Sequence, residues 1–254
     1  MALSSDPAIL LAMLRIEPCL VVALAPHGEH GNVGRFLSAE QGLAAAYIRG
    51  GRGRRMRGVL ALGNIVALEL VTRAPGQLAF ATVHPISTNM AMMHGAAALA
   101  LVEYVALLAA STLPEGEAQP GLFPLFAALF AAAGAGADAQ TCGAAMVRLE
   151  LALLAGLGLG LDLSSCAATG SHDDLAFVSP RSRQAVSRAA GEPWAARLLP
   201  LPAFLRDGGA ATPDQLADGL KLSGHFLARE LLAGHPAALR LQAARQRLVG
   251  LLLA

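Results

Sequence analysis

The spacing of apolar residues changes near Pro85, and this change constrains the fold more than any other feature of the sequence. From residue 7 to about residue 85, apolar residues form runs of five to eight that are separated by glycine-rich or polar turn signals. Such runs predict a small all-β barrel or sandwich of about five or six strands. Alanine is a poor strand former, so the first run, LLAMLRI, is also compatible with a helix.

Long stretches of alanine and leucine follow from Thr88 onward and predict helices. Start and stop signals, with Thr88 or Asn89 as the first cap, place them at about 88–111, 120–133, 138–158, 212–232 and from 236 onward. The clearest start is TPDQ at 212–215, which contains a capping threonine, a proline at the first helical position and a glutamine at the third. Two short strands are expected at about 175–178 and 184–186. The predicted fold is therefore α+β, with a β-barrel domain over 1–84 and a helical domain over 85–254 that holds an inserted turn and hairpin at 161–200.

A cluster of arginines interrupts the apolar runs of the N-terminal half, in the segment IRGGRGRRMRG at 48–58. Five of the chain's eighteen arginines fall within nine residues that contain no acidic side chain: Arg49, Arg52, Arg54, Arg55 and Arg57. Three glycines among them disfavour a helix, so we expect a flexible basic loop. Guanidinium groups bind phosphate in a bidentate fork, and such a loop therefore suits a polyanion. The alternative is a loop or Arg/Gly linker that only keeps the protein soluble.

The charge distribution supports a polyanion partner for the first half. Residues 1–83 carry eight arginines against five acidic residues, a net charge of +3, whereas residues 84–254 carry a net charge of −2. A basic loop between strands suits an OB-fold, whose face and loops bind oligonucleotides, and Arg35 is a further candidate contact. The rings of this half, Phe36, Tyr47 and Phe80, are each expected in the barrel core. Binding should then be mainly electrostatic, and log K should fall against log salt with a slope of roughly −3.

Composition excludes several classes of protein. A hydrophobic fraction of 55% with 15% charged residues excludes a disordered chain. The best candidate membrane span, 91–110, is interrupted by His94, Glu103 and Tyr104, so buried helices are favoured over a membrane protein. No signal peptide is recognised at the N-terminus. The three cysteines form no CxxC pair, which fits a reducing cytoplasm without disulfides.

Three short motifs resemble parts of enzymatic sites. The string His172-Asp173-Asp174 lies in a glycine-bounded turn, where aspartate side chains usually bond backbone amides, and no second histidine cluster accompanies it. GLGLG at 156–160 ends a helix, whereas a dinucleotide fingerprint opens one. Ser164 and Ser165 lack the G-x-S-x-G elbow of a nucleophile. We therefore expect no catalytic residues and no cofactor.

Two long stretches of the second half resemble the RecO family of bacterial DNA repair and recombination mediators. They are LELALLAGLGLGLDLSSCAATGSHDDLAFVSP and AVSRAAGEPWAARLLPLPAFL. Looser matches are HGEHG, the Gly/Arg segment and LALGN near the front, and ARQRLVGLL near the end. The resemblance extends over most of the chain and is most specific in the middle block.

The resemblance implies an N-terminal OB-fold, a helical C-terminal domain and a cytoplasmic, nucleoid-associated protein that needs no catalytic residues. RecO-like proteins bind single- and double-stranded DNA and anneal complementary strands. They also engage RecR and the C-terminal tail of single-strand binding protein, so that RecA is loaded indirectly. The five clustered arginines occupy the family's basic OB loop. Arg148 would meet the tail, and Arg240, Arg245 and Arg247 on the last helix either extend the DNA track or form its solvated side.

Many RecO-like proteins also carry a small zinc-binding subdomain built from two cysteine pairs. Cys166 stands at the first position here, but Thr169 follows where the second cysteine would be, and 188–191 contains no cysteine. One thiolate cannot build a structural tetrahedral site, so we expect a degenerate, zinc-less, zinc-finger-like hairpin and no metal. The sequence thus predicts a non-catalytic DNA-binding mediator. Two rivals remain, which are a hydrolase-like enzyme built on the helical half and a membrane-associated helical structural protein.

Overall fold

The computed structural model describes residues 12–72, 74, 76–88 and 95–254. The chain divides into two compact units. The barrel unit comprises Met1–Met90 and Leu113–Pro120, and the helical unit comprises Ala91–Thr112 and Gly121–Ala254. The predicted α+β class, with strands first and helices after them, is confirmed. Within the described residues, no helix combines the length and the apolar character needed to cross a membrane.

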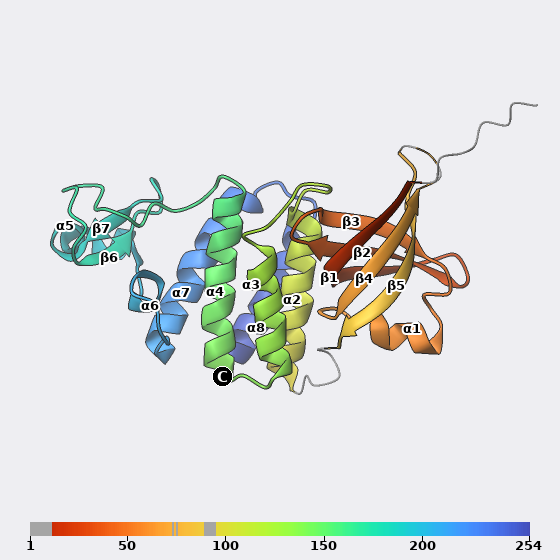
Figure 1. The fold of residues 1–254 in the computed structure, drawn as a ribbon. Coiled ribbons are helices and arrows are strands. Elements are labelled where there is room, and N and C mark those ends of the chain that lie inside the picture. Colours follow the sequence, from red (N-terminus) through yellow and green to blue (C-terminus); the bar gives the residue numbers. More distant parts are fainter. Residues whose placement is uncertain (1–11, 73, 75, 89–94) are drawn as a thin grey trace, which may run out of the picture. The chain divides into compact units, whose positions relative to one another are not determined.

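Five strands form the described part of the barrel unit (Figure 1, red to yellow). They are β1 (Ala12–His27), β2 (Gly31–Ser38), β3 (Gly42–Ile48), β4 (Ile65–Thr72) and β5 (Ala79–Ser87). The strands close in the order β1-β2-β3-β5-β4, and every neighbouring pair is antiparallel except β3 and β5, which run parallel. The first two apolar runs of the sequence join into the single long strand β1, so the helical alternative for 12–16 is wrong.

Alternation along the strands directs one set of side chains into the barrel and the other set outward. The barrel core contains Ile16, Cys19, Val21, Phe36, Ala46, Ile48, Leu60, Val66, Leu68 and Leu70. Because Val21 pairs with Phe36, and because Ala46 and Ile48 lie on the same face of β3, the intervening positions of β2 and β3 face outward. Tyr47 is therefore an outward residue.

Within its described residues the helical unit has five main helices, and α2, α3 and α4 lie side by side (Figure 1). They are α2 (Ala96–Thr112), α3 (Phe123–Gly134), α4 (Ala139–Gly156), α7 (Pro213–Phe226) and α8 (Ala238–Leu252). The predicted capping box is present, since the Gln215 amide donates to Thr212 Oγ1 and the Thr212 amide donates to Gln215 Oε1, both at 3.3 Å. The Thr141 amide likewise donates to Asp138 at 2.6 Å at the start of α4.

Two helix ends differ most from the predictions. The expected first cap does not begin a helix at Thr88, Asn89 lies outside the described residues, and α2 begins at Ala96. At the other end of the unit, α7 stops at Phe226 and a π-helical turn, η3 (Leu227–Leu231), completes the predicted span. Local start signals therefore located the caps of α4 and α7, whereas the start of α2 lacks such a signal.

A small sheet lies at one end of the helical unit, beyond α6 (Ala203–Arg206) and α7 (Figure 1). Its strands are β6 (Leu175–Val178) and β7 (Ala185–Ser187), which match the two predicted strands, and a third strand, β8 (Leu199–Pro200), which was not predicted. The order is β7-β6-β8. A short helix, α5 (Arg188–Gly191), and a 3-10 turn, η2 (Glu192–Arg197), connect β7 to β8.

The turn that contains Cys166 is held by hydrogen bonds and packing. The Cys166 amide donates to Ser171 O at 2.7 Å, and the Gly170 amide donates back to Cys166 O at 2.8 Å. The Cys166 thiol is 2% exposed and accepts from the Ser187 amide at 3.2 Å. Neighbouring positions offer no further thiols, so these residues do not fit zinc, and the likeness to a zinc finger is not supported beyond the hairpin itself.

Candidate nucleic-acid interface

The basic segment, defined here as Arg49–Arg57, is half turn and half helix. Residues 49–53 form turns that follow β3, and Arg54–Val59 forms the short helix α1. The prediction of a flexible loop without helix is therefore wrong for its second half. The three glycines at 50, 51 and 53 all precede the helix, where Gly50 has a φ of +68° that suits a glycine. Arginine and methionine, which are good helix formers, follow them.

Tertiary packing fixes α1 on the barrel. Met56 and Val59 pack against the barrel core, and Leu60, at the C-terminal end of the helix, is 1% exposed. Their spacing of three and four residues places them on one face of a helix, with the arginines on the other. The side-chain amide of Asn64 donates to Gly58 O at 2.7 Å and Val59 O at 3.2 Å, so it satisfies carbonyls at the end of α1. Sequence analysis missed Asn64, although the apolar spacing in RRMRGVL could have indicated the helix.

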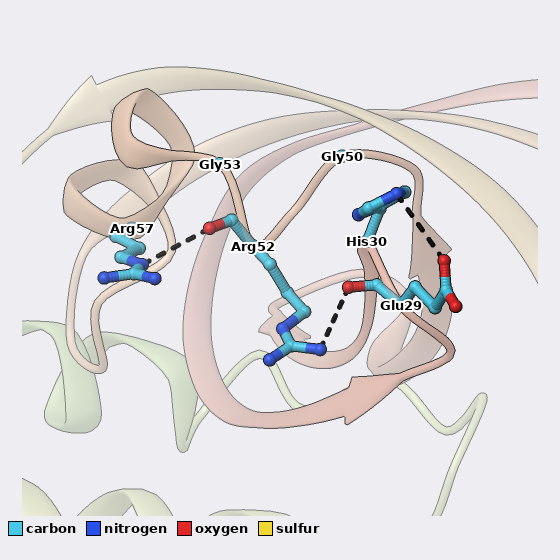
Figure 2. A pocket seen from close by; sticks show the side chains of 6 residues that line it. All are labelled: Glu29, His30, Gly50, Arg52, Gly53 and Arg57. Carbon is cyan, nitrogen blue, oxygen red and sulfur yellow. Dashed lines mark hydrogen bonds and ion pairs between the residues drawn. The ribbon is translucent and has the colours of Figure 1, made fainter.

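Two of the arginines line an open pocket of about 450 Å³ at the base of the β1–β2 turn (Figure 2). Arg52 lies between Arg57 on one side and Glu29 and His30 on the other. Arg52 Nη1 donates to Glu29 O at 3.0 Å and Gly28 O at 3.4 Å, and Arg57 Nε donates to Arg52 O at 3.3 Å. These bonds tie the basic segment to the β1–β2 turn through backbone carbonyls, which leave the guanidinium charges uncompensated.

The positive charge of the basic segment remains exposed. All five arginine residues are exposed, and among the described residues none of them forms an ion pair with a carboxylate. Guanidinium groups folded back onto acidic side chains would have had no charge to offer to phosphate. The geometry instead presents five cations within one turn and one helix, next to an open pocket. Such a surface can bind a polyanion without reading its sequence.

Arg35 lies elsewhere on the barrel unit and is paired. It extends from β2, and its Nη2 donates to Glu115 Oε1 at 2.5 Å. Glu115 belongs to Leu113–Pro120, the segment that packs with the barrel unit. Arg35 therefore lacks the uncompensated charge that characterises the basic segment.

Arg245 was expected either to extend the DNA track or to lie on the solvated side of the last helix. It is instead part of a buried polar network. Its side chain is 15% exposed, and its guanidinium donates to Glu150 at 2.8 and 3.0 Å, to Leu220 O at 2.8 Å and to Ser223 Oγ at 3.0 Å. Tyr104 donates to the same carboxylate at 2.6 Å. Burial would lower the pKa of Arg245, but the Glu150 carboxylate raises it above its ordinary value. Arg245 thus connects α4, α7 and α8 and is withdrawn from ligands.

The remaining candidate arginines of the helical unit are only partly engaged. Arg240 is exposed on α8. Arg247, on the same helix, forms an ion pair with Glu103. Arg148 Nη2 donates to Phe204 O at 3.1 Å and Gly209 O at 2.6 Å, and its guanidinium lies 5.1 Å from the centre of the Phe204 ring. Arg148 therefore holds the end of α6 in place.

The string His172-Asp173-Asp174 lies in a turn that is held by local hydrogen bonds. His172 Nδ1 lies 2.8 Å from Ser164 O, and Asp174 accepts from Arg188 Nε at 3.3 Å. An aspartate side chain was expected to accept from a backbone amide in this turn. The acceptor is instead Ser171 Oγ, to which the Asp173 amide donates at 3.1 Å. Within the described part of the chain, no three His, Cys, Asp or Glu side chains are grouped so as to hold a metal ion.

Comparison with known proteins confirms the resemblance seen in the sequence. Residues 93–238 match the family model described as "Recombination protein O C terminal". The "DNA repair protein RecO" of Methylorubrum extorquens strain PA1 is 41% identical over 221 residues, which cover 84% of this chain and 88% of that protein. The proteins of the same name from Acidiphilium cryptum strain JF-5 (42% over 235 residues, 88% and 90% covered) and Rhodospirillum rubrum (40% over 235 residues, 91% and 92% covered) are similarly related. This chain belongs to the RecO family.

Proposed function

We propose that this protein is a DNA-binding mediator of recombination in DNA repair and that it has no catalytic activity of its own. The observation that carries the proposal is the basic segment, where five exposed arginines, none of them paired with a carboxylate among the described residues, lie on a turn and helix fixed to a β-barrel. The strand order, with β3 and β5 parallel, supports an OB-fold, a barrel class that binds oligonucleotides. The names of the related proteins support a role in DNA repair.

The basic segment would bind DNA through its phosphates. Guanidinium groups contact the backbone in a bidentate fork and leave base edges free to pair, so two bound strands at high local concentration can anneal. We limit the proposed DNA surface of the barrel to Arg49, Arg52, Arg54, Arg55 and Arg57, because Arg35 is paired with Glu115. On the helical unit, Arg240 is an exposed candidate contact of its own, whereas Arg247 is paired with Glu103 and the burial of Arg245 removes it from the surface.

Protein partners would direct the molecule to DNA already coated by single-strand binding protein. We propose that the helical unit receives the acidic C-terminal tail of that protein and that RecR joins the complex, so that RecA is loaded at a cytoplasmic, nucleoid-associated site. Arg148 is the proposed contact for the tail carboxylate. Among the described residues, both of its hydrogen bonds to carbonyls use Nη2. The Nε and Nη1 donors would then bind the carboxylate of the tail.

The proposal is tested by removing three cations of α1 together. We expect the Arg54→Ala/Arg55→Ala/Arg57→Ala protein to bind a fluorescent single-stranded oligonucleotide on the order of ten- to hundredfold more weakly at about 50 mM salt. The slope of log K against log salt should also become flatter by roughly 2 units, since about 0.7 units are lost per phosphate contact. Fluorescence anisotropy at two salt concentrations measures both quantities.

A matched control removes exposed arginines that are already paired. Arg188 pairs with Asp174 at 3.3 Å and Arg229 pairs with Glu230 at 3.2 Å. The Arg188→Ala/Arg229→Ala protein should keep the affinity and salt slope of the unaltered protein. Equal weakening in both variants would show that net charge, and not the basic segment, determines binding. Unchanged binding in the triple variant would overturn the proposed role of the segment.

A further inference from the structure

Three outward-facing rings form a row across the outer surface of the barrel, next to the basic segment. His27 ends β1, Tyr47 lies on β3 and Phe80 lies on β5. The His27 and Tyr47 ring centroids are 5.6 Å apart with an interplanar angle of 75°, and the Tyr47 and Phe80 centroids are 5.6 Å apart at 84°. Both pairs have the edge-to-face geometry that aromatic rings prefer. The expectation that all barrel rings are core residues therefore holds for Phe36 but not for Tyr47 and Phe80.

A glycine allows the row to be continuous. β2 lies between β1 and β3 in the barrel, and Gly31 is the β2 residue that pairs with His27. A Cβ atom built on Gly31 would lie 2.3 Å from Tyr47 Cε2 and 2.3 Å from Tyr47 Oη, which is closer than atoms can approach. The Tyr47 ring therefore lies directly over the β2 backbone, and the row crosses β1, β2, β3 and β5 without an intervening side chain.

The row is accessible, and it lies at the end of β2 and β3 where the basic segment begins. Phe80 is 39% exposed and His27 is exposed, while Tyr47 is half-buried between them. The opposite end of these strands is covered, because the Gly116 amide donates to Leu43 O at 3.0 Å and the Gln119 amide donates to Ala39 O at 2.8 Å. The segment Leu113–Pro120 thus pairs with the chain at one end of these strands, and Tyr47 lies at the other.

The phosphate-binding groups flank the rings on two sides. Arg49 follows Tyr47 by two residues, directly after β3. Arg52 is hydrogen-bonded to the carbonyls of Gly28 and Glu29, the two residues that follow His27. Cations and exposed rings are therefore held together at two places, the end of β3 and the turn that follows β1. Flexible single strands are bound in this way, with phosphates on basic side chains and bases stacked on aromatic faces.

We propose that His27, Tyr47 and Phe80 form a base-stacking subsite for single-stranded nucleic acid, which makes the interface selective for single strands over duplexes. The inference rests on the proposed function, because it assumes that the basic segment binds the phosphates of the same strand. Bases within a duplex are stacked on each other and cannot reach the rings. Stacking occupies the faces of the bases and leaves their pairing edges exposed, so a strand bound in this way can still meet its complement.

The test compares a variant that keeps a ring with one that keeps only apolar bulk. We expect Phe80→Leu to weaken binding of a single-stranded oligonucleotide on the order of tenfold, and Phe80→Trp to retain it, because only the latter can stack. Binding of duplex DNA and the salt slope should be the same in both variants. An oligonucleotide containing 2-aminopurine should lose its fluorescence change on binding to Phe80→Leu. Ile86→Ala is the matched control, since Ile86 is 53% exposed on β5 but belongs to no ring pair.

A second variant displaces a ring without removing one. Gly31→Ala places a methyl group where the Tyr47 ring lies, and it should reduce single-strand affinity without changing duplex affinity. Thermal unfolding monitored by circular dichroism identifies any variant that fails to fold, and Phe80→Leu then carries the test alone. Equal affinity of Phe80→Leu and the unaltered protein would overturn the inference but leave the proposed function standing. A loss shared by single strands and duplexes would also overturn it, and an unaltered protein that binds no DNA would overturn both proposals.

Discussion

The arginines of the basic segment and Arg245 carry the same charge in opposite surroundings. On the barrel unit, Arg54 and Arg55 extend from an exposed helix face and lack carboxylate partners among the described residues. In the helical unit, the Arg245 guanidinium is enclosed by a carboxylate, a carbonyl and a hydroxyl, and the Glu150 side chain that it meets is fully buried. The difference shows that position within the fold, and not residue type, decides whether a cation is enclosed by partners or left exposed.

The buried network exists because a charge withdrawn from water needs several partners. Four helices supply them, since Tyr104 lies on α2, Glu150 on α4, Ser223 on α7 and Arg245 on α8. A Cβ atom on Gly224 would lie 2.4 Å from Arg245 Nη1, so this glycine makes room for the guanidinium. The arginines of the basic segment have no such enclosure among the described residues, and all five are exposed.

The largest expected effect follows from removing one member of the buried pair. Glu150→Leu should destabilise the helical unit by about 3–5 kcal/mol, because the Arg245 guanidinium would remain buried without its carboxylate. The double variant Glu150→Leu/Arg245→Met should recover most of this loss, since apolar residues can replace a buried ion pair. Urea unfolding followed by the fluorescence of Trp194, the chain's one tryptophan, reports on this unit. A single variant as stable as the unaltered protein would contradict the network.

A smaller effect is expected from removing the hydroxyl group of Tyr104, which belongs to the same network. Tyr104→Phe deletes the 2.6 Å hydrogen bond to Glu150 and should cost about 2 kcal/mol near neutral pH. Burial, followed by the negative charge of Glu150, raises the pKa of Tyr104 well above its ordinary value. A raised pKa gives a stability contribution that is fully present below the unfolded pKa of about 10 and is lost as the pH rises through the folded value. The difference between the two proteins should therefore be constant below about pH 10 and shrink above it, as urea midpoints across pH can show.

On the barrel unit, Asn64→Ala tests whether the fixed position of α1 matters independently of the charge of its arginines. The variant removes the donor to Gly58 O and Val59 O and should cost about 1 kcal/mol of stability. It should also weaken single-strand binding by roughly threefold, because α1 would no longer be held in one orientation before binding. Anisotropy measures the affinity, and an unchanged salt slope would show that no phosphate contact was lost. Unchanged affinity would mean that the charge of the segment matters and its fixed position does not.

The smallest effect on stability is expected from the basic segment itself. Arg54→Ala/Arg55→Ala should change the free energy of unfolding by no more than about 0.5 kcal/mol, since both residues are exposed and lack carboxylate partners within the described chain. Thermal unfolding of this variant and of Glu150→Leu, measured side by side, compares the loss of exposed arginines with the loss of a buried partner. A marked destabilisation would show that these arginines support the barrel, and the contrast with Arg245 would then fail.

Local signals in the sequence predicted the parts of the fold that local chemistry determines. The capping box at Thr212 and the cap at Asp138 each lie within four residues of what they satisfy, and both were located correctly. The role of Arg245 could not be predicted, because its partner Glu150 is 95 residues away. Helix α1 was missed because its preceding glycines were counted against it, while the apolar spacing of Met56, Val59 and Leu60 was not. The exterior position of Tyr47 required the barrel register, which the sequence leaves open.

The segment Leu113–Pro120 makes the barrel unit discontinuous in the chain. After Thr112 the polypeptide returns to pair Leu43 with Glu115 and then re-enters the helical unit at Gly121. A gene fragment ending at Met90 would therefore encode a barrel that lacks one of its own parts, with a bare edge beside Leu43 and without the ion pair between Arg35 and Glu115. Neither unit of this protein is a single contiguous stretch of the chain.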